Sequence, residues 1–135
     1  MRTVEHMLET SRSQPLDLTT HLACVEKCFE CMQACTACAD ACLGEPQVGE
    51  LVRCIRLNLD CADVCLATGQ IVLRQTATDC TLVRAIVESC TAACKQCGDE
   101  CIRYGEHGME HCQICAEACQ RCQDACIDLL RVLAA

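Results

Sequence analysis

Cysteine recurs along this chain with the spacing of one face of an α-helix. In the first long segment the steps between successive cysteines are 4, 3, 4, 3 and 4 residues. These residues are Cys24, Cys28, Cys31, Cys35, Cys38 and Cys42. Positions three or four apart lie on the same side of a helix, so the six thiols form one unbroken stripe. The pattern predicts a long helix with one face made of sulfur.

Three later segments carry cysteine and aliphatic residues in the same helical register. They contain three, five and five cysteines. In chain order these are Cys54, Cys61, Cys65, Cys80, Cys90, Cys94, Cys97, Cys101, Cys112, Cys115, Cys119, Cys122 and Cys126. We therefore expect all 19 cysteines of the chain to face inward.

Glycine and proline mark the ends of these segments. Pro15 precedes the first, and Gly44 and Pro46 follow it. Thr76 and Asp79 have the spacing of a capping box, which would open the third segment. The predicted helices span about residues 16–43, 47–75, 79–104 and 109–133.

Short connections favour helices that lie antiparallel to their neighbours in sequence. We therefore predict an all-α fold, an antiparallel up-down-up-down four-helix bundle. Residues 1–135 suffice for one domain with a single core. Residues 1–13 add a short N-terminal helical extension that docks through Val4, Met7 and Leu8 on the bundle or on a neighbouring subunit.

Charge and composition exclude several classes of partner. The net charge is -8, and Phe29 and Tyr104 are the only aromatic residues, so no nucleic-acid surface is indicated. The opening residues MRTVEHMLETSRSQ lack the apolar core of a signal peptide, and no stretch has the length of a membrane span. We expect a cytoplasmic protein, in a compartment that keeps thiols reduced.

An odd number of cysteines in a reducing compartment indicates metal binding or thiol chemistry instead of a disulfide framework. Residues one helical turn apart have Cβ atoms roughly 5 to 6 Å apart, whereas a disulfide needs roughly 3.5 to 4.5 Å. Pairs such as Cys24 and Cys28 can instead clip a metal between two thiolates. Cysteine used only as a small core residue is the structural alternative, but a core built for stability would use leucine, isoleucine and valine.

Soft thiolates select Cu(I), Zn(II) or iron–sulfur clusters. One Cu(I) per thiolate would leave a dry core neutral, with an upper bound of about 19 ions set by the sulfur count. Zinc requires a tetrahedron of ligands, and no loop carries the cysteine run typical of iron–sulfur proteins. Copper is the first choice. A zinc or general metal-sequestering protein, and a thiol redox or electron-transfer protein, remain as alternatives.

The antiparallel order gathers polar residues at one end of the bundle. His107 and His111 lie there with Asn58, and we expect them to be metal ligands at the mouth. Met109 is expected to point outward. The other end collects aliphatic residues, and we expect His21 to have a structural role there.

A second apolar line runs beside the core stripe of the second helix, which a monomer would expose. Its residues are Val52, Ile55, Leu59, Ala62, Leu66 and Leu73. We expect it to form the interface of a homo-oligomer. The alternative is that residues 1–13 cover it.

The run from His107 to Cys126, H-x-x-x-H-C-x-x-C-x-x-x-C-x-x-C-x-x-x-C, and the repeated C-x-x-x-C clips resemble the cytosolic copper storage proteins. The resemblance covers all four predicted helices. It implies a homotetramer of four-helix bundles that binds many Cu(I) ions. It also implies that the 19 cysteines are ligands, with His107, His111 and Asn58 at the mouth. No catalytic base or nucleophile pair is indicated, so we expect copper homeostasis by binding and not an enzyme; a delivering or receiving protein is not identifiable from the sequence.

Overall fold

The computed structural model describes residues 2–13 and 17–134, and in this part of the chain all regular secondary structure is helical. It contains α1 (Arg2–Thr10), α2 (Leu18–Leu43), the 3₁₀ turn η1 (Val48–Glu50), α3 (Val52–Leu73), α4 (Cys80–Gly105) and α5 (Glu110–Ala134). The predicted all-α class is confirmed. The predicted start of the first long helix, at residue 16 after Pro15, lies outside the described residues. Among the described helices, none combines the length and hydropathy of a membrane span.

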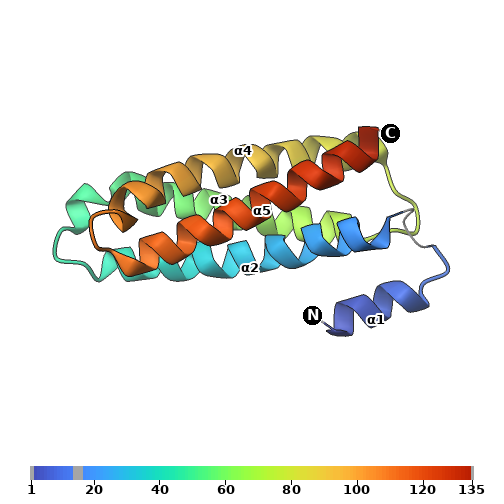
Figure 1. Ribbon diagram of the computed structural model, residues 1–135, viewed down its shortest axis with the longest axis horizontal. Helices are drawn as coiled ribbons and strands as arrows, with labels where there is room; N and C mark the ends of the chain where they lie inside the picture. Colours follow the sequence, from blue (N-terminus) through green and yellow to red (C-terminus); the bar gives the residue numbers. More distant parts are fainter. Residues whose placement is uncertain (1, 14–16, 135) are drawn as a thin grey trace.

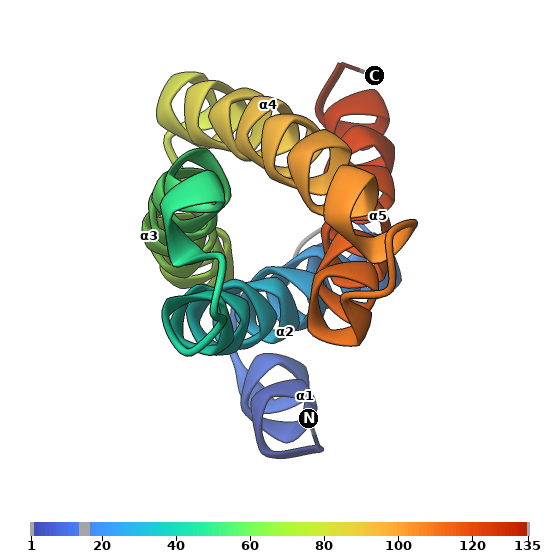
Figure 2. The same cartoon turned by 90° about the vertical axis from the view of Figure 1, so that its left-hand side faces the viewer.

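The four long helices surround a common core. Helix α2 packs against α3 and α5, and α4 packs against the same two neighbours, which closes a ring (Figure 2). Figure 1 shows the connections from α2 to α3 and from α4 to α5 at one end of the molecule, and the connection from α3 to α4 at the other. Residues from all four helices can therefore meet along one axis.

The aspartates set where two of these helices begin. The Asp17 carboxylate accepts the backbone N–H of Thr20 at 3.0 Å, and Asp79 accepts that of Thr81 at 2.9 Å. Each satisfies an amide that has no partner inside its helix. The predicted capping box starting at Thr76 is wrong, because Asp79 is itself the N-cap and α4 starts at Cys80.

The second predicted helix is not continuous. Residues Val48–Glu50 form the tighter η1 turn, and Leu51 separates it from α3. Leu51 is fully buried, so the chain bends there while keeping an aliphatic side chain in the core. The bend lies at the same end of the bundle as the start of α5.

One end of the core is filled by hydrocarbon. Val72, Val83, Val87 and Leu129 are at most 4% exposed and pack together with the innermost cysteines. The aliphatic plug predicted from the sequence is therefore present. A cation would have to displace these side chains to pass that end.

The short helix α1 lies outside the ring (Figure 2). Leu8 is buried and Val4 packs against the core, as predicted, but Met7 is 67% exposed. Met7 therefore does not dock on the bundle of its own chain, although it lines the same groove as Val4 and Leu8. Helix α1 and residues 73–77 line a groove of about 640 Å³.

Candidate metal centre

The centre of the bundle is a continuous network of thiols. All 19 cysteines are free, and all but Cys80 are buried. Neighbouring sulfurs lie 3.7 to 4.0 Å apart, both within one helix and between helices. Cys31 of α2, for example, contacts Cys61 of α3 at 4.0 Å and Cys119 of α5 at 3.8 Å. The network therefore ties the long helices together through sulfur.

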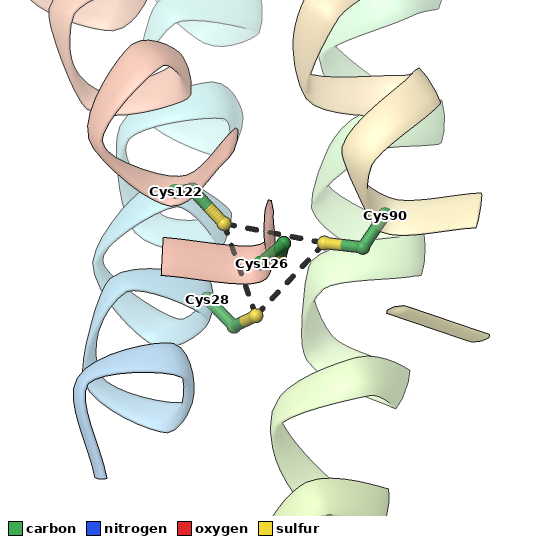
Figure 3. A group of neighbouring side chains, drawn as sticks. All are labelled: Cys28, Cys90, Cys122 and Cys126. Carbon is green, nitrogen blue, oxygen red and sulfur yellow. Dashed lines mark hydrogen bonds between the residues drawn. The ribbon is translucent and has the colours of Figure 1, made fainter. Parts of the chain in front are cut away.

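Figure 3 shows one group of four cysteines from three helices. Cys28 of α2 lies 3.9 Å from Cys90 of α4 and 3.8 Å from Cys122 of α5, measured between sulfurs. The Cys90 and Cys122 sulfurs are 4.0 Å apart, and Cys126 completes the group. The three thiols joined by dashed lines point toward one another. Such a triangle can enclose one ion.

These spacings suit a metal ion and not a disulfide. A disulfide bond is about 2.05 Å long, far below the observed separations. Three sulfurs bound to one ion at about 2.3 Å would lie about 4.0 Å apart, and four around a tetrahedral ion about 3.8 Å apart. The core therefore has the sulfur spacing of a metal-thiolate site. Distance alone fits both trigonal and tetrahedral coordination.

Further groups continue along the axis of the bundle. Each consists of four buried cysteines whose sulfurs lie within 4.8 Å of one another. They are Cys31, Cys61, Cys65 and Cys94; Cys31, Cys35, Cys61 and Cys119; and Cys35, Cys97, Cys115 and Cys119. Because Cys31, Cys35, Cys61 and Cys119 each belong to two groups, the sites are not separate. The column can share bridging sulfurs from one ion to the next.

Asn58 lies inside this column. It is fully buried, and its Oδ1 accepts the thiols of Cys97 at 3.0 Å and Cys115 at 3.2 Å. Its Nδ2 donates to the sulfur of Cys54 at 3.7 Å. The amide thus satisfies its hydrogen bonds with thiols alone, which removes the penalty of burying it. The predicted rim position of Asn58 is too shallow, because its side chain is enclosed by cysteines of three helices.

The outermost group mixes sulfur with nitrogen. Cys38, Cys42, His111 and Cys112 bring their ligand atoms within 4.8 Å of one another. His111 Nδ1 is 3.5 Å from the sulfurs of both Cys38 and Cys112. On the opposite edge of the imidazole, His111 Nε2 is 3.1 Å from Glu45 Oε1. We call these four residues the mouth group, and in it the imidazole of His111 contacts two thiols.

His107 does not share this position. It is exposed, and its Nδ1 lies 2.6 Å from the backbone oxygen of Arg103. Met109 is half-buried and packs against the core cluster instead of pointing fully outward as expected. The two histidines of the i, i+4 pair therefore face different surroundings, with His111 toward the sulfurs and His107 toward solvent.

At the end of the bundle opposite the mouth group, two residues on the inward stripes lie outside the thiol network. Cys80 is exposed at the start of α4, so its predicted inward position is wrong; the helix begins at this residue, before its core-facing turns. His21 is buried, and its Nδ1 lies 2.8 Å from the backbone oxygen of Asp17. That contact joins His21 to the N-cap of α2, which fits the structural role expected for it.

Burial and neighbouring thiols shift the pKa values in opposite directions. Burial raises the pKa of Cys42 to about 11 and also raises the pKa of Cys112. A hydrogen bond from the Cys101 thiol lowers the pKa of Cys54 to about 3, and the Asn58 amide donates to the same sulfur. An incoming cation therefore has to displace protons at Cys42 and Cys112, because burial keeps these two thiols protonated.

Glu45 is the contact that the sequence pattern does not reveal. It follows Gly44, the C-cap of α2, and belongs to no stripe, so periodicity carries no signal for it. Only the packing of the α2–η1 connection against α5 brings its carboxylate to His111.

An all-helical chain with a buried column of thiols and a mixed nitrogen–sulfur mouth defines a multinuclear metal-thiolate protein. The sequence model of the copper storage protein family (Csp) matches residues 18–131, and the chain belongs to this family. The matched range contains every cysteine described above.

Known relatives agree with this membership. The structure of the copper storage protein Ccsp from Streptomyces lividans, loaded with 10 copper equivalents, is similar with a TM-score of 0.92 and 46% identity, covering 95% of this chain and 98% of that chain. The Cu(I)-bound copper storage protein BsCsp3 is similar with a TM-score of 0.70 and 37% identity, covering 87% and 100%. An uncharacterized cysteine-rich protein of Bacillus subtilis, YhjQ, is 39% identical over 91 residues, which are 67% of this chain and 78% of that protein.

Proposed function

We propose that this protein binds and stores many Cu(I) ions through the cysteine thiolates of its core, and so buffers or detoxifies copper. The observation that carries this function is the column of buried sulfurs, 3.7 to 4.0 Å apart, that runs along the core from the mouth group to the aliphatic end. Membership of the copper storage family and the copper-loaded relatives support it.

Charge favours Cu(I) as the stored ion. Thiolates in a dry core are stable only when their negative charge is balanced. One monovalent ion per thiolate achieves this balance, and the sulfurs that belong to two of the four-sulfur groups can bridge two ions. A zinc ion in a four-cysteine group would leave two negative charges uncompensated. The capacity set by the buried sulfurs is therefore about one Cu(I) per buried cysteine.

The proposed ligands are the buried cysteines, His111 and Asn58. The contacts of Asn58 Oδ1 and His111 Nδ1 with thiols support their inclusion. His107, in the connection that precedes α5, is proposed as an outer residue that passes copper toward His111. Cys80, exposed and at the plugged end, is left out of the stored set.

The finer architecture is proposed from the same observations. The alternation of the connections between the two ends supports an antiparallel up-down-up-down bundle that forms a single domain (Figure 1). The histidine end is the proposed mouth, because the other end is closed by Val72, Val87 and Leu129. We propose that the protein is cytoplasmic, and the similar cytosolic copper storage protein of Streptomyces lividans supports this compartment. We also propose that it is not an enzyme.

We further propose a homo-oligomer, a tetramer by family resemblance, that buries the outer face of α3. Val52, Leu59 and Leu66 remain 64%, 46% and 39% exposed, so α1 does not cover them. Such a row of aliphatic side chains is stabilised by contact with a second copy.

Anaerobic titration with Cu(I) against a competing chelator tests the function. Saturation near one Cu(I) per buried thiol is expected. A parallel titration with Zn(II) separates the alternatives, since saturation at one zinc per four cysteines with higher affinity than copper would indicate a zinc protein. Binding of only one or two Cu(I) ions would refute storage.

A further inference from the structure

We propose that Glu45 is a positioning residue that holds the His111 ring in the orientation and tautomer that accept Cu(I) at the mouth group. This inference rests on the proposed storage function and adds a residue to it. Glu45 would not bind the ion itself. It would act through the imidazole that does.

The contacts place the two sides of the His111 ring in different surroundings. Glu45 Oε1 lies 3.1 Å from Nε2, whereas Nδ1 lies 3.5 Å from the sulfurs of Cys38 and Cys112. The imidazole therefore bridges a carboxylate and two thiols. The carboxylate lies on the imidazole edge away from the sulfurs. Glu45 therefore contacts Nε2 of the histidine and not the thiols.

The chemistry of neutral imidazole determines which of the two ring nitrogens can bind a cation in this arrangement. One ring nitrogen carries the proton and the other keeps its lone pair. A carboxylate accepts only, so Glu45 selects the tautomer with the proton on Nε2. The lone pair of Nδ1 then faces Cys38 and Cys112, where a cation would sit. The opposite tautomer would point an N–H at the site and block it.

The backbone holds Glu45 firmly enough for this role. Its amide N–H donates to the carbonyl of Cys42 at 3.2 Å, and its own carbonyl accepts the N–H of Val48 at 3.2 Å. The residue is thus fixed to the end of α2 on one side and to η1 on the other. The side chains of Glu45 and His111 are 29% and 26% exposed, so the contact is shielded from much of the solvent.

Two measurements test the proposal in the full chain. The first is long-range ¹H–¹⁵N NMR of the copper-free protein at about pH 8, where an unperturbed imidazole is neutral. The His111 signals, identified by their loss in His111→Ala, should show Nε2 protonated and Nδ1 unprotonated. In Glu45→Ala they should show a mixture of tautomers. A protonated Nδ1 in the wild type, or an unchanged spectrum in Glu45→Ala, overturns the proposal.

The second measurement is the rate of Cu(I) transfer from a Cu(I)–chelator complex at low copper to protein ratios. Loss of a residue that orients a metal-ligating histidine typically lowers affinity or activity 10- to 100-fold, so Glu45→Ala should slow transfer about 10-fold. Glu45→Gln should restore most of the rate, because its amide oxygen still accepts the Nε2 proton. In the His111→Ala background, Glu45→Ala should have no further effect.

A charge control separates positioning from electrostatic attraction. Glu50 lies in the same connection, carries the same charge and is exposed. Glu50→Ala should leave the His111 spectrum unchanged and slow transfer less than Glu45→Ala. The positioning role is overturned if Glu50→Ala slows Cu(I) transfer as much as Glu45→Ala does. It is also overturned if Glu45→Ala slows transfer equally in the wild-type and His111→Ala backgrounds. Total Cu(I) capacity should be unchanged in Glu45→Ala. A low capacity in the wild type would contradict the storage function, but it would not affect the test of the tautomer by NMR.

Discussion

The exposed face of α3 yields a quantitative prediction about self-association. Leu59 and Leu66 lie two helical turns apart, so they point in the same direction. They are 46% and 39% exposed in the single chain. The double variant Leu59→Glu, Leu66→Glu replaces both with charged side chains. Because neither residue belongs to the buried core, we expect the fold of each chain to persist.

The exposed fractions set the size of the effect. Full burial of a leucine side chain contributes about 2 kcal/mol, so covering the exposed part contributes about 0.9 kcal/mol at Leu59 and about 0.8 kcal/mol at Leu66. In a two-fold interface each residue occurs twice, giving a loss of about 3.4 kcal/mol per contact between two copies. This loss corresponds to a dissociation constant about 300-fold higher. Desolvation of the introduced carboxylates adds to it.

Sedimentation velocity over a concentration series measures the association, and circular dichroism checks that the helices remain. Ile114→Glu is the matched control, since this residue is 57% exposed on α5, across the ring from α3 (Figure 2). The control should leave association unchanged. An unaltered oligomer in the double variant, or equal dissociation by the control, would refute the reasoning.

Three further outcomes are expected. Cys94→Ser should lower the Cu(I) capacity by at least about one ion, whereas Cys80→Ser should leave it unchanged, as chelator competition can measure. Gly69→Ala places a methyl group 2.6 Å from the Phe29 ring, so urea unfolding should show a loss of about 1 to 3 kcal/mol that Phe29→Leu partly restores. Because the Cys42 pKa is about 11, copper displaces its proton; the mouth affinity should fall about tenfold per unit decrease in pH for each proton displaced, and less steeply in Cys42→Ser.

The inward stripes show how far periodicity reaches. The spacing of the cysteines predicts their helices and their shared face, and the structure buries all of them except Cys80. Cys80 fits the heptad register as well as the others do. Its exposure follows from its place at the first residue of α4, which depends on Asp79 acting as the N-cap. Register alone carries no information on where a helix starts.

The mouth illustrates the same limit for polar residues. His107 and His111 have the spacing that places them on one face, yet only His111 turns toward the thiols. Their exact directions depend on the loop before α5 and on its packing against α2. Glu45 has no periodic partner at all, and it reaches His111 only because the α2–η1 connection packs against the start of α5.

Residue types and their spacing were enough to predict that this protein is helical, that its core is made of sulfur and that it binds soft metal ions. These properties follow from residue type and from the 3.6-residue period, both of which are local. The tertiary structure alone decided which thiols form groups, how deeply Asn58 lies and which histidine contacts them. Those features depend on distances between helices that are far apart along the chain, and only the packing of side chains sets such distances.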